Sequence, residues 1–231
     1  GLGKPVKEVF LEQKKKPLII LAGCLSGSAK SERPRIVFKE LKGKTGWVDE
    51  YITPSEIYKL PEILHRNRPG TKVIPHASEN IAYINISYGC DNFCTYCVVP
   101  YSRGKEISRS EKEISDEIKD FVKKGIKEVM LCGQNVNSWG LSSEEKFNIR
   151  SGSKQRLPFA GLLRKVHQIE GLEKISFLSS NPFDFTEDLI DVLKLPKISN
   201  YIHIAVQSGN NEILKKMNRR HTVEEFEKLI K

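Results

Sequence analysis

The feature that most constrains this chain is a run of three closely spaced cysteines, Cys90, Cys94 and Cys97, in a CxxxCxxC pattern. They follow an apolar, strand-like stretch that ends in a glycine, so three thiolates share one short loop. Three thiolates are one ligand short of a closed zinc site and of an ordinary four-cysteine iron–sulfur cluster. Either a fourth ligand comes from elsewhere in the chain, or one metal position stays open to a substrate or cofactor.

The spacing alone leaves three interpretations: an iron–sulfur site, a zinc knuckle completed by a distant histidine, and reduced thiols at the surface. It favours the iron–sulfur site. A disulfide framework is not expected, because five cysteines in a lysine-rich chain without an export signal are typical of an intracellular protein. No apolar run approaches the ~20 residues of a bilayer span. We therefore expect a cytoplasmic protein with no membrane partner.

The charge balance suggests a class of partner. Lys and Arg outnumber Asp and Glu by 38 to 29, which gives a formal net charge of +9. Such an excess is compatible with a polyanion such as nucleic acid, although a generally lysine-rich composition explains it equally well. Two short basic clusters, residues 154–156 and 218–221, would contribute to such a surface.

The N-terminal part of the chain predicts a small parallel α/β layer. A surface helix over residues 1–16 is followed by strand, helix, strand and helix patterns. Cys24 stands where the first, buried strand would give way to a loop. Residues 67–80 are rich in Pro, Gly and Asn, so we place a boundary there and assign residues 1–75 and 76–231 to separate domains.

The second domain alternates between strand and helix patterns. Strands are predicted over residues 82–89, 127–134, 174–180 and 201–209, and helices over 114–125, 157–169, 186–195 and 224–231. A polar loop follows the second strand. Four βα units in succession indicate an α/β fold with a parallel sheet and helices outside, either open or curled toward a barrel.

Each polar motif of this domain falls where a predicted strand ends. The motifs begin at Cys90 and cover residues 133–135, 179–181 and 207–209. In parallel α/β folds the carboxyl edge of the sheet holds the site. We therefore expect these four motifs to meet at one edge.

Three cysteines in this spacing, with the aromatic Tyr96 before the last of them, resemble the motif of the radical S-adenosylmethionine (SAM) enzymes. The longer string GCDNFCTYCVVPYSRGKEISRS, residues 89–110, resembles one branch of that family, the methylthiotransferases. Further strings are similar to the same branch in the same order: GQNVNSWG (133–140), SSNPFDF (179–185) and VQSGNNEILKKMNRRHT (206–222).

The resemblance implies that Cys90, Cys94 and Cys97 hold a [4Fe–4S] cluster whose open iron binds SAM. It also implies an auxiliary [4Fe–4S] cluster in the N-terminal domain, so two in the intact protein, with Cys24 as one of three cysteine ligands. Taken alone, Cys24 is interpreted as a small buried hydrophobic side chain at a strand end. The family has further N-terminal cysteines, two more βα units and an RNA-binding TRAM domain. We therefore expect an internal fragment with a partial (β/α) barrel.

The same resemblance assigns SAM contacts outside the cysteines. Tyr96 would lie against the adenine, and Gln134 and Asn135 at the aminocarboxylate end. Ser179 and Gln207 would lie at the ribose or the substrate edge. Taken alone, the aromatic ring is also an ordinary packing residue.

Two arginines after the cysteines, Arg103 and Arg109, would bind the SAM carboxylate or an RNA phosphate. Each is equally well interpreted as a solvated side chain. No catalytic residue is expected beyond the cluster and SAM.

The GQN at residues 133–135 favours the MiaB-type branch of the methylthiotransferases. That branch uses two SAM molecules to add a methylthio group to carbon 2 of isopentenyl-modified adenosine next to the tRNA anticodon. The resemblance thus implies tRNA as a partner, an electron donor such as flavodoxin or ferredoxin, and a monomer, and leaves the sulfur source unknown. The alternatives are a methylthiotransferase for threonylcarbamoyl-adenosine tRNA or for a ribosomal protein and, in another class, a zinc-containing RNA-binding module without catalysis.

Overall fold

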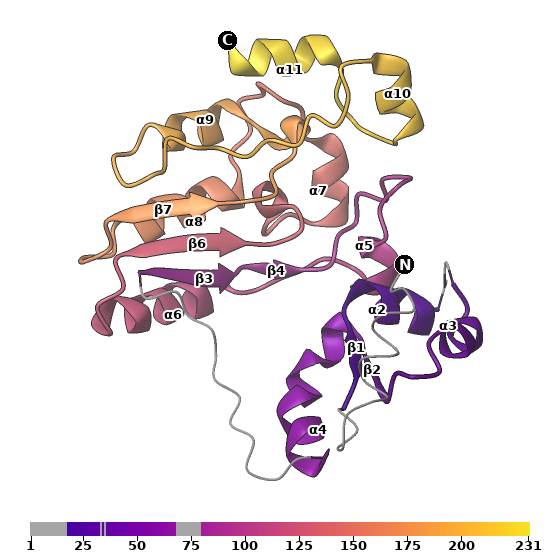
Figure 1. Ribbon diagram of the computed structural model, residues 1–231. Helices are drawn as coiled ribbons and strands as arrows, with labels where there is room; N and C mark the ends of the chain where they lie inside the picture. The colour runs from indigo at the N-terminus through magenta and orange to yellow at the C-terminus, as the bar shows by residue number, and fades with distance from the viewer. Residues whose placement is uncertain (1–17, 33, 35, 68–79) are drawn as a thin grey trace. The chain divides into compact units, whose positions relative to one another are not determined.

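The computed structural model describes residues 18–32, 34, 36–67 and 80–231. The helix predicted over residues 1–16 and most of the predicted boundary at 67–80 lie outside them. The chain divides into two compact units (Figure 1). Unit 1 comprises residues 1–75 together with Val98–Gly104, and unit 2 comprises His76–Cys97 and Lys105–Lys231. Within the described ranges, no helix is both long enough and apolar enough to cross a membrane.

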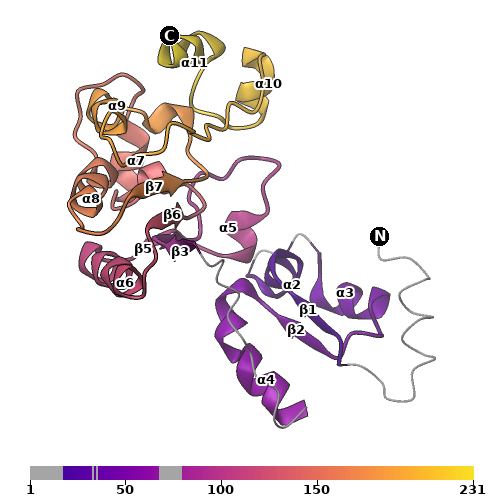
Figure 2. The ribbon, with the colours of Figure 1, turned by 60° about the vertical axis from the view of Figure 1, so that its left-hand side comes forward.

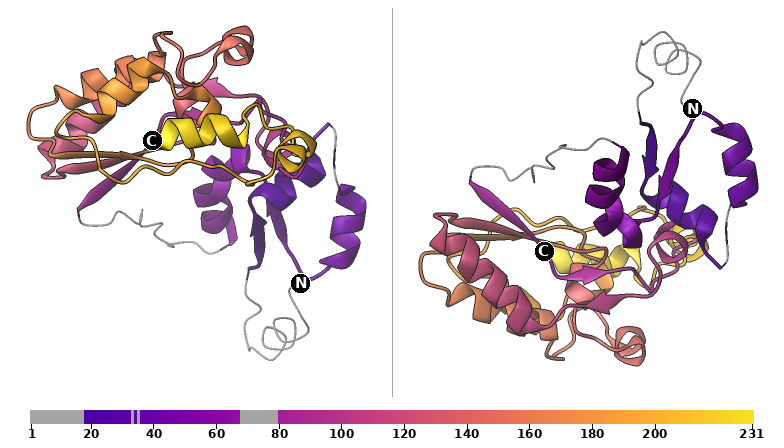
Figure 3. Two further views of the ribbon diagram at one scale, coloured as in Figure 1. Left: turned by 90° about the horizontal axis from the view of Figure 1, so that it is seen from above. Right: turned by 90° about the horizontal axis from the view of Figure 1, so that it is seen from below.

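Unit 1 is built on two short parallel strands, β1 (Ile20–Ala22) and β2 (Glu50–Ile52). Figure 3 shows α3 on one side of these strands and α4 on the other. The predicted order of strand, helix, strand and helix is confirmed. The helical segments of the unit are α2 (Cys24–Lys30), α3 (Phe38–Lys44), the 3-10 helix η1 (Pro54–Lys59), α4 (Leu60–Asn67) and α5 (Val99–Ser102).

Two details of the prediction for unit 1 are wrong. Cys24 does not open a loop, because it is the first residue of α2, whose residues 26–29 are buried. The strand β1 is half-buried to exposed rather than buried. A sheet of two strands has no central strand, so neither strand is covered along both edges.

The burial of α2 comes from its close packing against α5, the segment that follows Cys97 in the chain. The backbones of α2 and α5 approach each other closely at Gly27. A Cβ atom there would lie 2.5 Å from the carbonyl oxygen of Ser102 and 2.8 Å from Cδ of Pro54. Only glycine allows this approach of one backbone to another.

Unit 2 is organised around a parallel sheet with the strand order β3 (Ile81–Asn85), β6 (Glu128–Cys132), β7 (Lys174–Phe177). The helices α6 (Glu111–Lys123), α8 (Pro158–His167) and α9 (Glu187–Leu193) lie in a row beside it (Figure 2). Between sheet and helices lies a core of fully buried apolar side chains, in which the rings of Phe159 and Phe177 pack edge to face at 5.3 Å. The predicted parallel α/β fold is confirmed.

The helix α6 shows how the sequence specifies these elements. Ser110 caps its N-terminus by accepting a hydrogen bond from the Glu113 N–H. Ile114 and Ile118, one turn apart, are fully buried against the sheet. Gly125, with a φ of 91°, follows its C-terminus in the left-handed conformation that glycine favours.

The strand predicted over residues 201–209 is wrong. That segment makes only isolated bridges, Ile175 to Ile198 and Ser180 to Ile204, so the sheet has three strands among the described residues. Its alternating apolar pattern is real, but side-chain pattern does not fix how many backbone pairs form.

Several short helices were not predicted, because each is less than two turns long and carries little periodicity. They are η2 (Val136–Ser138) and α7 (Ser143–Asn148) in the predicted polar loop, η3 (Pro182–Asp184) after β7, and α10 (Asn211–Lys216) before the predicted final helix α11 (Val223–Ile230).

Candidate cofactor-binding site

The cysteine loop is closed at its base by two short antiparallel strands, β4 (Ser87–Tyr88) and β5 (Ile107–Ser108). Beside them the Arg109 N–H donates a hydrogen bond to the carbonyl oxygen of Ile86 at 2.8 Å. Gly89, with a φ of 75°, turns the chain into the loop. The loop therefore leaves and re-enters the fold at the carboxyl end of β3.

The three loop cysteines are in the reduced form and make no disulfide; Cys90 and Cys94 are buried and Cys97 is half-buried. Nitrogen donors face two of the sulfur atoms. Nδ2 of Asn92 donates to Sγ of Cys90, and Nη1 of Arg219 donates to Sγ of Cys94, both at 3.5 Å. Such donors stabilise sulfur in its thiolate form, which is the form that binds metal.

The chemistry of these thiols fits an iron–sulfur cluster. Burial raises the pKa of the Cys90 thiol to about 11, so a thiolate there needs a strongly positive partner such as iron. Within the described part of the chain, no three His, Cys, Asp or Glu side chains converge closely enough to hold a single metal ion. Cluster ligands need not converge in that way, because each cysteine binds a different iron.

The cysteine loop is fastened to a segment more than a hundred residues later. The Thr95 N–H donates to the Met217 carbonyl at 3.2 Å, and Nδ2 of Asn218 donates to the carbonyls of Asn92 and Phe93 at 3.3 and 3.2 Å. Phe93 and Asn218 both have positive φ, 47° and 57°. These contacts hold the loop in one conformation, as a preorganised ligand set requires.

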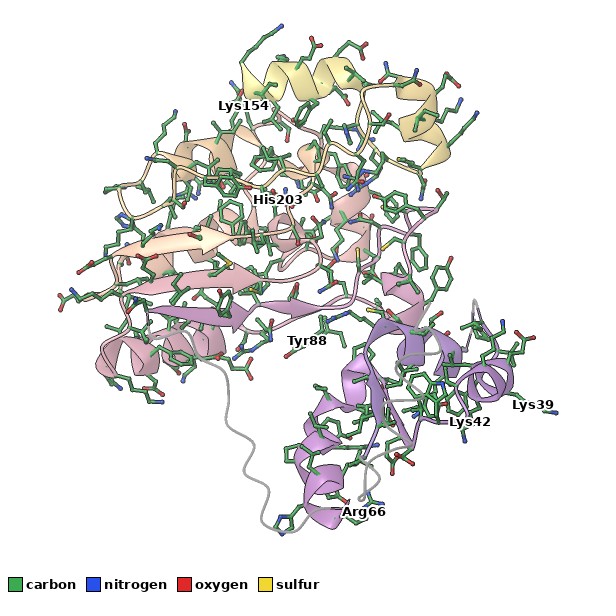
Figure 4. The ribbon with its side chains drawn as sticks, viewed as in Figure 1. Lys39, Lys42, Arg66, Tyr88, Lys154 and His203 are labelled. Atoms are coloured by element: carbon green, nitrogen blue, oxygen red, sulfur yellow. The ribbon has the colours of Figure 1, made fainter. Side chains whose placement is uncertain are left out.

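The two basic clusters of the sequence have different surroundings. Residues 154–156 are exposed, and Figure 4 shows Lys154 at the surface of unit 2. Arg219 and Arg220 of the cluster at 218–221 are instead partly buried, and both guanidinium groups lie over the ring of Phe183, at 5.3 and 4.1 Å. The expectation of a basic surface at 218–221 is therefore wrong for these two arginines.

The segments that follow β6 and β7 are joined by paired amide hydrogen bonds. Nδ2 of Asn137 donates to the Asn181 carbonyl at 2.8 Å, and the Asn181 N–H donates back to Oδ1 of Asn137 at 3.0 Å. The Val136 N–H donates to the carbonyl of Ser179 at 3.1 Å. Ser179 and Gln207, each near the end of a predicted strand, have φ of 68° and 69°. Strained non-glycine backbone of this kind tends to occur at functional sites.

Charged side chains are buried beside the loop, and each has a partner. Nζ of Lys146 lies 3.2 Å from Oε2 of Glu106 and 3.4 Å from Oδ2 of Asp91. Burial raises the pKa of Glu106, with the nearby Lys146 opposing that rise. Fully buried Asp184 accepts a hydrogen bond from Nδ2 of Asn135 at 3.0 Å, and burial raises its pKa to about 6.

The structure places the predicted SAM contacts in different environments. Tyr96 and Gln207 are exposed, and Gln134 and Ser179 are half-buried, so their side chains are accessible to a ligand. Arg109 is already engaged: its Nη1 donates to Oε2 of Glu117 at 2.6 Å and to the Asn85 carbonyl at 2.7 Å.

Three further predicted residues differ from these in burial or in the unit to which they belong. Asn135 is 1% exposed, and its Oδ1 atom has no hydrogen-bond partner among the described residues, so one acceptor there is unused. Cys24 lies in unit 1, half-buried at the start of α2. Arg103 belongs to unit 1 as well.

Sequence reasoning missed the polar residues that surround the loop. They are Asp91, Glu106, Lys146, Asp184, Arg219 and Arg220. All of them except Lys146 stand inside strings that resemble the family, and that position was the available signal. The two arginines were predicted only as part of a basic cluster. Nothing in the sequence near Lys146 distinguishes it from a surface lysine of an exposed helix.

Comparison with known proteins agrees with this geometry. Residues 84–231 match the family model described as the radical SAM superfamily. The chain is 40% identical over 233 residues to a tRNA-2-methylthio-N(6)-dimethylallyladenosine synthase of Clostridium tetani, covering 94% of this chain and 48% of that protein. It is 35% identical over 247 residues to the synthase of the same name from Thermoanaerobacter sp. strain X514, covering 99% of this chain and 49% of that protein. The chain thus spans about half the length of these curated relatives.

A solved structure shares the fold. The radical S-adenosylmethionine methyltransferase TsrM from Kitasatospora setae, with tryptophan substrate and a SAM analogue, superimposes with a TM-score of 0.50. The match covers 65% of this chain and 28% of that one at 18% identity, and so concerns the fold alone. With its cysteine loop at the carboxyl end of a parallel sheet and the family model matched across unit 2, the chain belongs to the radical SAM superfamily.

Proposed function

We propose that this chain is the core of a tRNA methylthiotransferase, which adds a methylthio group to carbon 2 of isopentenyl-modified adenosine beside the anticodon. The observation that carries the proposal is the cysteine loop at the carboxyl end of β3, whose three reduced thiols lie in a loop fastened by hydrogen bonds to Met217 and Asn218. The names of the relatives in two genera support the substrate. They do not favour a ribosomal protein or threonylcarbamoyl-adenosine as the target.

The residues of unit 2 have distinct roles in this proposal. Cys90, Cys94 and Cys97 would hold a [4Fe–4S] cluster, leaving one iron for SAM. Bound together, cluster and SAM supply the one-electron chemistry that attacks an unreactive carbon. Tyr96 and Gln134, which are accessible beside the loop, would contact SAM, as would Ser179, Gln207 and Asn135. The partly buried loop keeps the thiol ligands from water.

Arg109 is a weaker candidate for SAM binding than the other predicted residues, because its guanidinium already pairs with Glu117. We assign it the structural role of tying the end of the cysteine loop to α6. Arg103 stays a candidate for an RNA phosphate.

Unit 1 would belong to the domain that carries the auxiliary cluster, with Cys24 at the N-terminus of α2 as one ligand. The proposed partners are tRNA and an electron donor of the flavodoxin or ferredoxin class, and we expect a cytoplasmic monomer. The charge of +9 supports a polyanionic substrate.

The test is anaerobic reconstitution of the chain with iron and sulfide, followed by addition of SAM and dithionite. We expect about four irons on the loop cysteines and the formation of 5′-deoxyadenosine. Cys94→Ala should lose both, because it removes a buried ligand. Cys132→Ala is the matched control, since Cys132 lies within β6 and should leave both unchanged.

Two results would contradict the proposal. One is zinc in place of iron at one ion per chain, which would favour the RNA-binding module. The other is a cluster that never cleaves SAM. The choice of substrate is tested by mass spectrometry of isopentenyl-modified tRNA after incubation, with threonylcarbamoyl-modified tRNA and a ribosomal protein as competing substrates.

A further inference from the structure

Arg219 makes a direct contact with one of the proposed cluster ligands. Its Nη1 atom donates a hydrogen bond to Sγ of Cys94 at 3.5 Å. We propose that Arg219 sets the reduction potential of the cluster through this hydrogen bond. The inference rests on the proposed function, because it requires the loop cysteines to hold an iron–sulfur cluster.

The guanidinium of Arg219 is held in place independently of the sulfur. Its Nη2 atom donates to Oδ1 of Asn181 at 2.5 Å and to the carbonyl of Ala205 at 2.8 Å. Its plane lies over the ring of Phe183, 5.3 Å from the centroid. A planar guanidinium fixed at three points loses little further freedom when it contacts the sulfur, so the hydrogen bond is preorganised.

The surroundings make this contact electrostatically effective. Cys94 is 9% exposed, so little water screens the charge on its sulfur. Reduction adds one electron to the cluster, and a cation beside a ligand stabilises the reduced form more than the oxidised form. Hydrogen bonds to the sulfur atoms and net charge are among the factors that set cluster potentials. Arg219 should therefore raise the potential and make the cluster easier to reduce.

The neighbouring Arg220 also interacts electrostatically with Cys94, but its direct contacts are different. Its guanidinium lies 3.5 Å from Oδ1 of Asp184 and 3.4 Å from Oδ1 of Asn92, so its charge is opposed by a buried carboxylate. It makes no described hydrogen bond to a cysteine sulfur. Two adjacent arginines thus have separate tasks: Arg220 balances Asp184, and Arg219 faces the cluster ligand.

The experiment is a redox titration of the reconstituted chain. The amount of reduced cluster at each potential is measured from its electron paramagnetic resonance signal. Arg219→Met removes the donor and keeps much of the volume. We expect the ratio of reduced to oxidised cluster at a fixed potential to fall about tenfold, which corresponds to about 59 mV for one electron. Arg156→Met, at an exposed arginine of the same unit, should leave the ratio unchanged.

A second variant covers the case in which Arg219→Met fails to assemble a cluster. The side chain of Asn181 bonds Arg219, whereas its backbone makes the contacts to Asn137. Asn181→Ala therefore loosens the guanidinium without removing it, and should lower the ratio in the same direction by a smaller factor.

The outcomes separate the two proposals. If the wild-type chain binds iron and titrates as a cluster, but both variants titrate at the wild-type potential, the role of Arg219 is refuted and the proposed function stands. If the wild-type chain takes up zinc or assembles no cluster, the proposed function fails and the inference fails with it.

Discussion

Gly27→Ala tests the packing of the helix that carries Cys24. Ordinarily, replacing glycine by alanine within a helix is stabilising by about 1 kcal/mol, through helix propensity and reduced freedom of the unfolded chain. Here the new Cβ would lie 2.5 Å from the carbonyl oxygen of Ser102 and 2.8 Å from Cδ of Pro54. Both distances are roughly 1 Å inside an ordinary van der Waals contact.

Neither neighbour can yield by rotating a side chain. The Ser102 atom is backbone, and the Pro54 ring is fixed in the first turn of η1. Overpacking of this kind costs about 1–3 kcal/mol. After the gain from helix propensity is subtracted, we expect the free energy of unfolding of unit 1 to fall by up to about 2 kcal/mol. Gly43→Ala in α3 is the matched control, because its Cβ meets nothing within 4 Å, and it should be stabilising by about 0.5–1 kcal/mol.

The assay is urea unfolding monitored by tryptophan fluorescence. The chain has two tryptophans, of which Trp47 lies in unit 1 and Trp139 in unit 2. In a Trp139→Phe background, the emission of Trp47 reports unit 1 alone. If Gly27→Ala stabilises unit 1 as much as Gly43→Ala does, then α5 does not pack on α2 as described, and the reasoning is refuted.

The sequence was sufficient to predict the position of the site, because its signals are local. The cysteine spacing and the apolar runs that form β3 and β6 lie within short stretches of sequence, and parallel strands bring their carboxyl ends to one edge. The pairing of Arg109 with Glu117 could also have been predicted from the sequence. A helix capped at Ser110 places Glu117 on its second turn, near the end of the cysteine loop.

The remaining features depend on contacts between distant segments. Residues 24–30, CLSGSAK, contain few strong helix formers, so packing on α5 rather than propensity explains α2. Arg219 reaches a sulfur 125 residues earlier in the chain. A buried lysine such as Lys146 has the same local signature as a solvated one, and only the fold distinguishes them.

Two further changes test the buried charges beside the cysteine loop. Lys146→Met leaves Glu106 buried without its cation, so we expect the free energy of unfolding of unit 2 to fall by about 3 kcal/mol. Adding Glu106→Gln to this variant should recover part of the lost stability. The measurement is urea unfolding monitored by the fluorescence of Trp139, the tryptophan of unit 2. If the double variant is no more stable than Lys146→Met, the pairing is contradicted. Asp184 gives a test that depends on pH. Its burial raises the pKa from the ordinary 3.8 to about 6. Between these values the folded state keeps a proton that the unfolded state has released. The contribution of Asp184 to stability is therefore fully present below pH 3.8 and is lost as the pH rises through about 6. Asp184→Asn stays neutral and keeps an oxygen that accepts from Asn135, so its stability should fall less over this range than that of the wild type. Equal slopes in the two proteins would mean that the cation of Arg220 outweighs the cost of burial and keeps Asp184 ionised throughout.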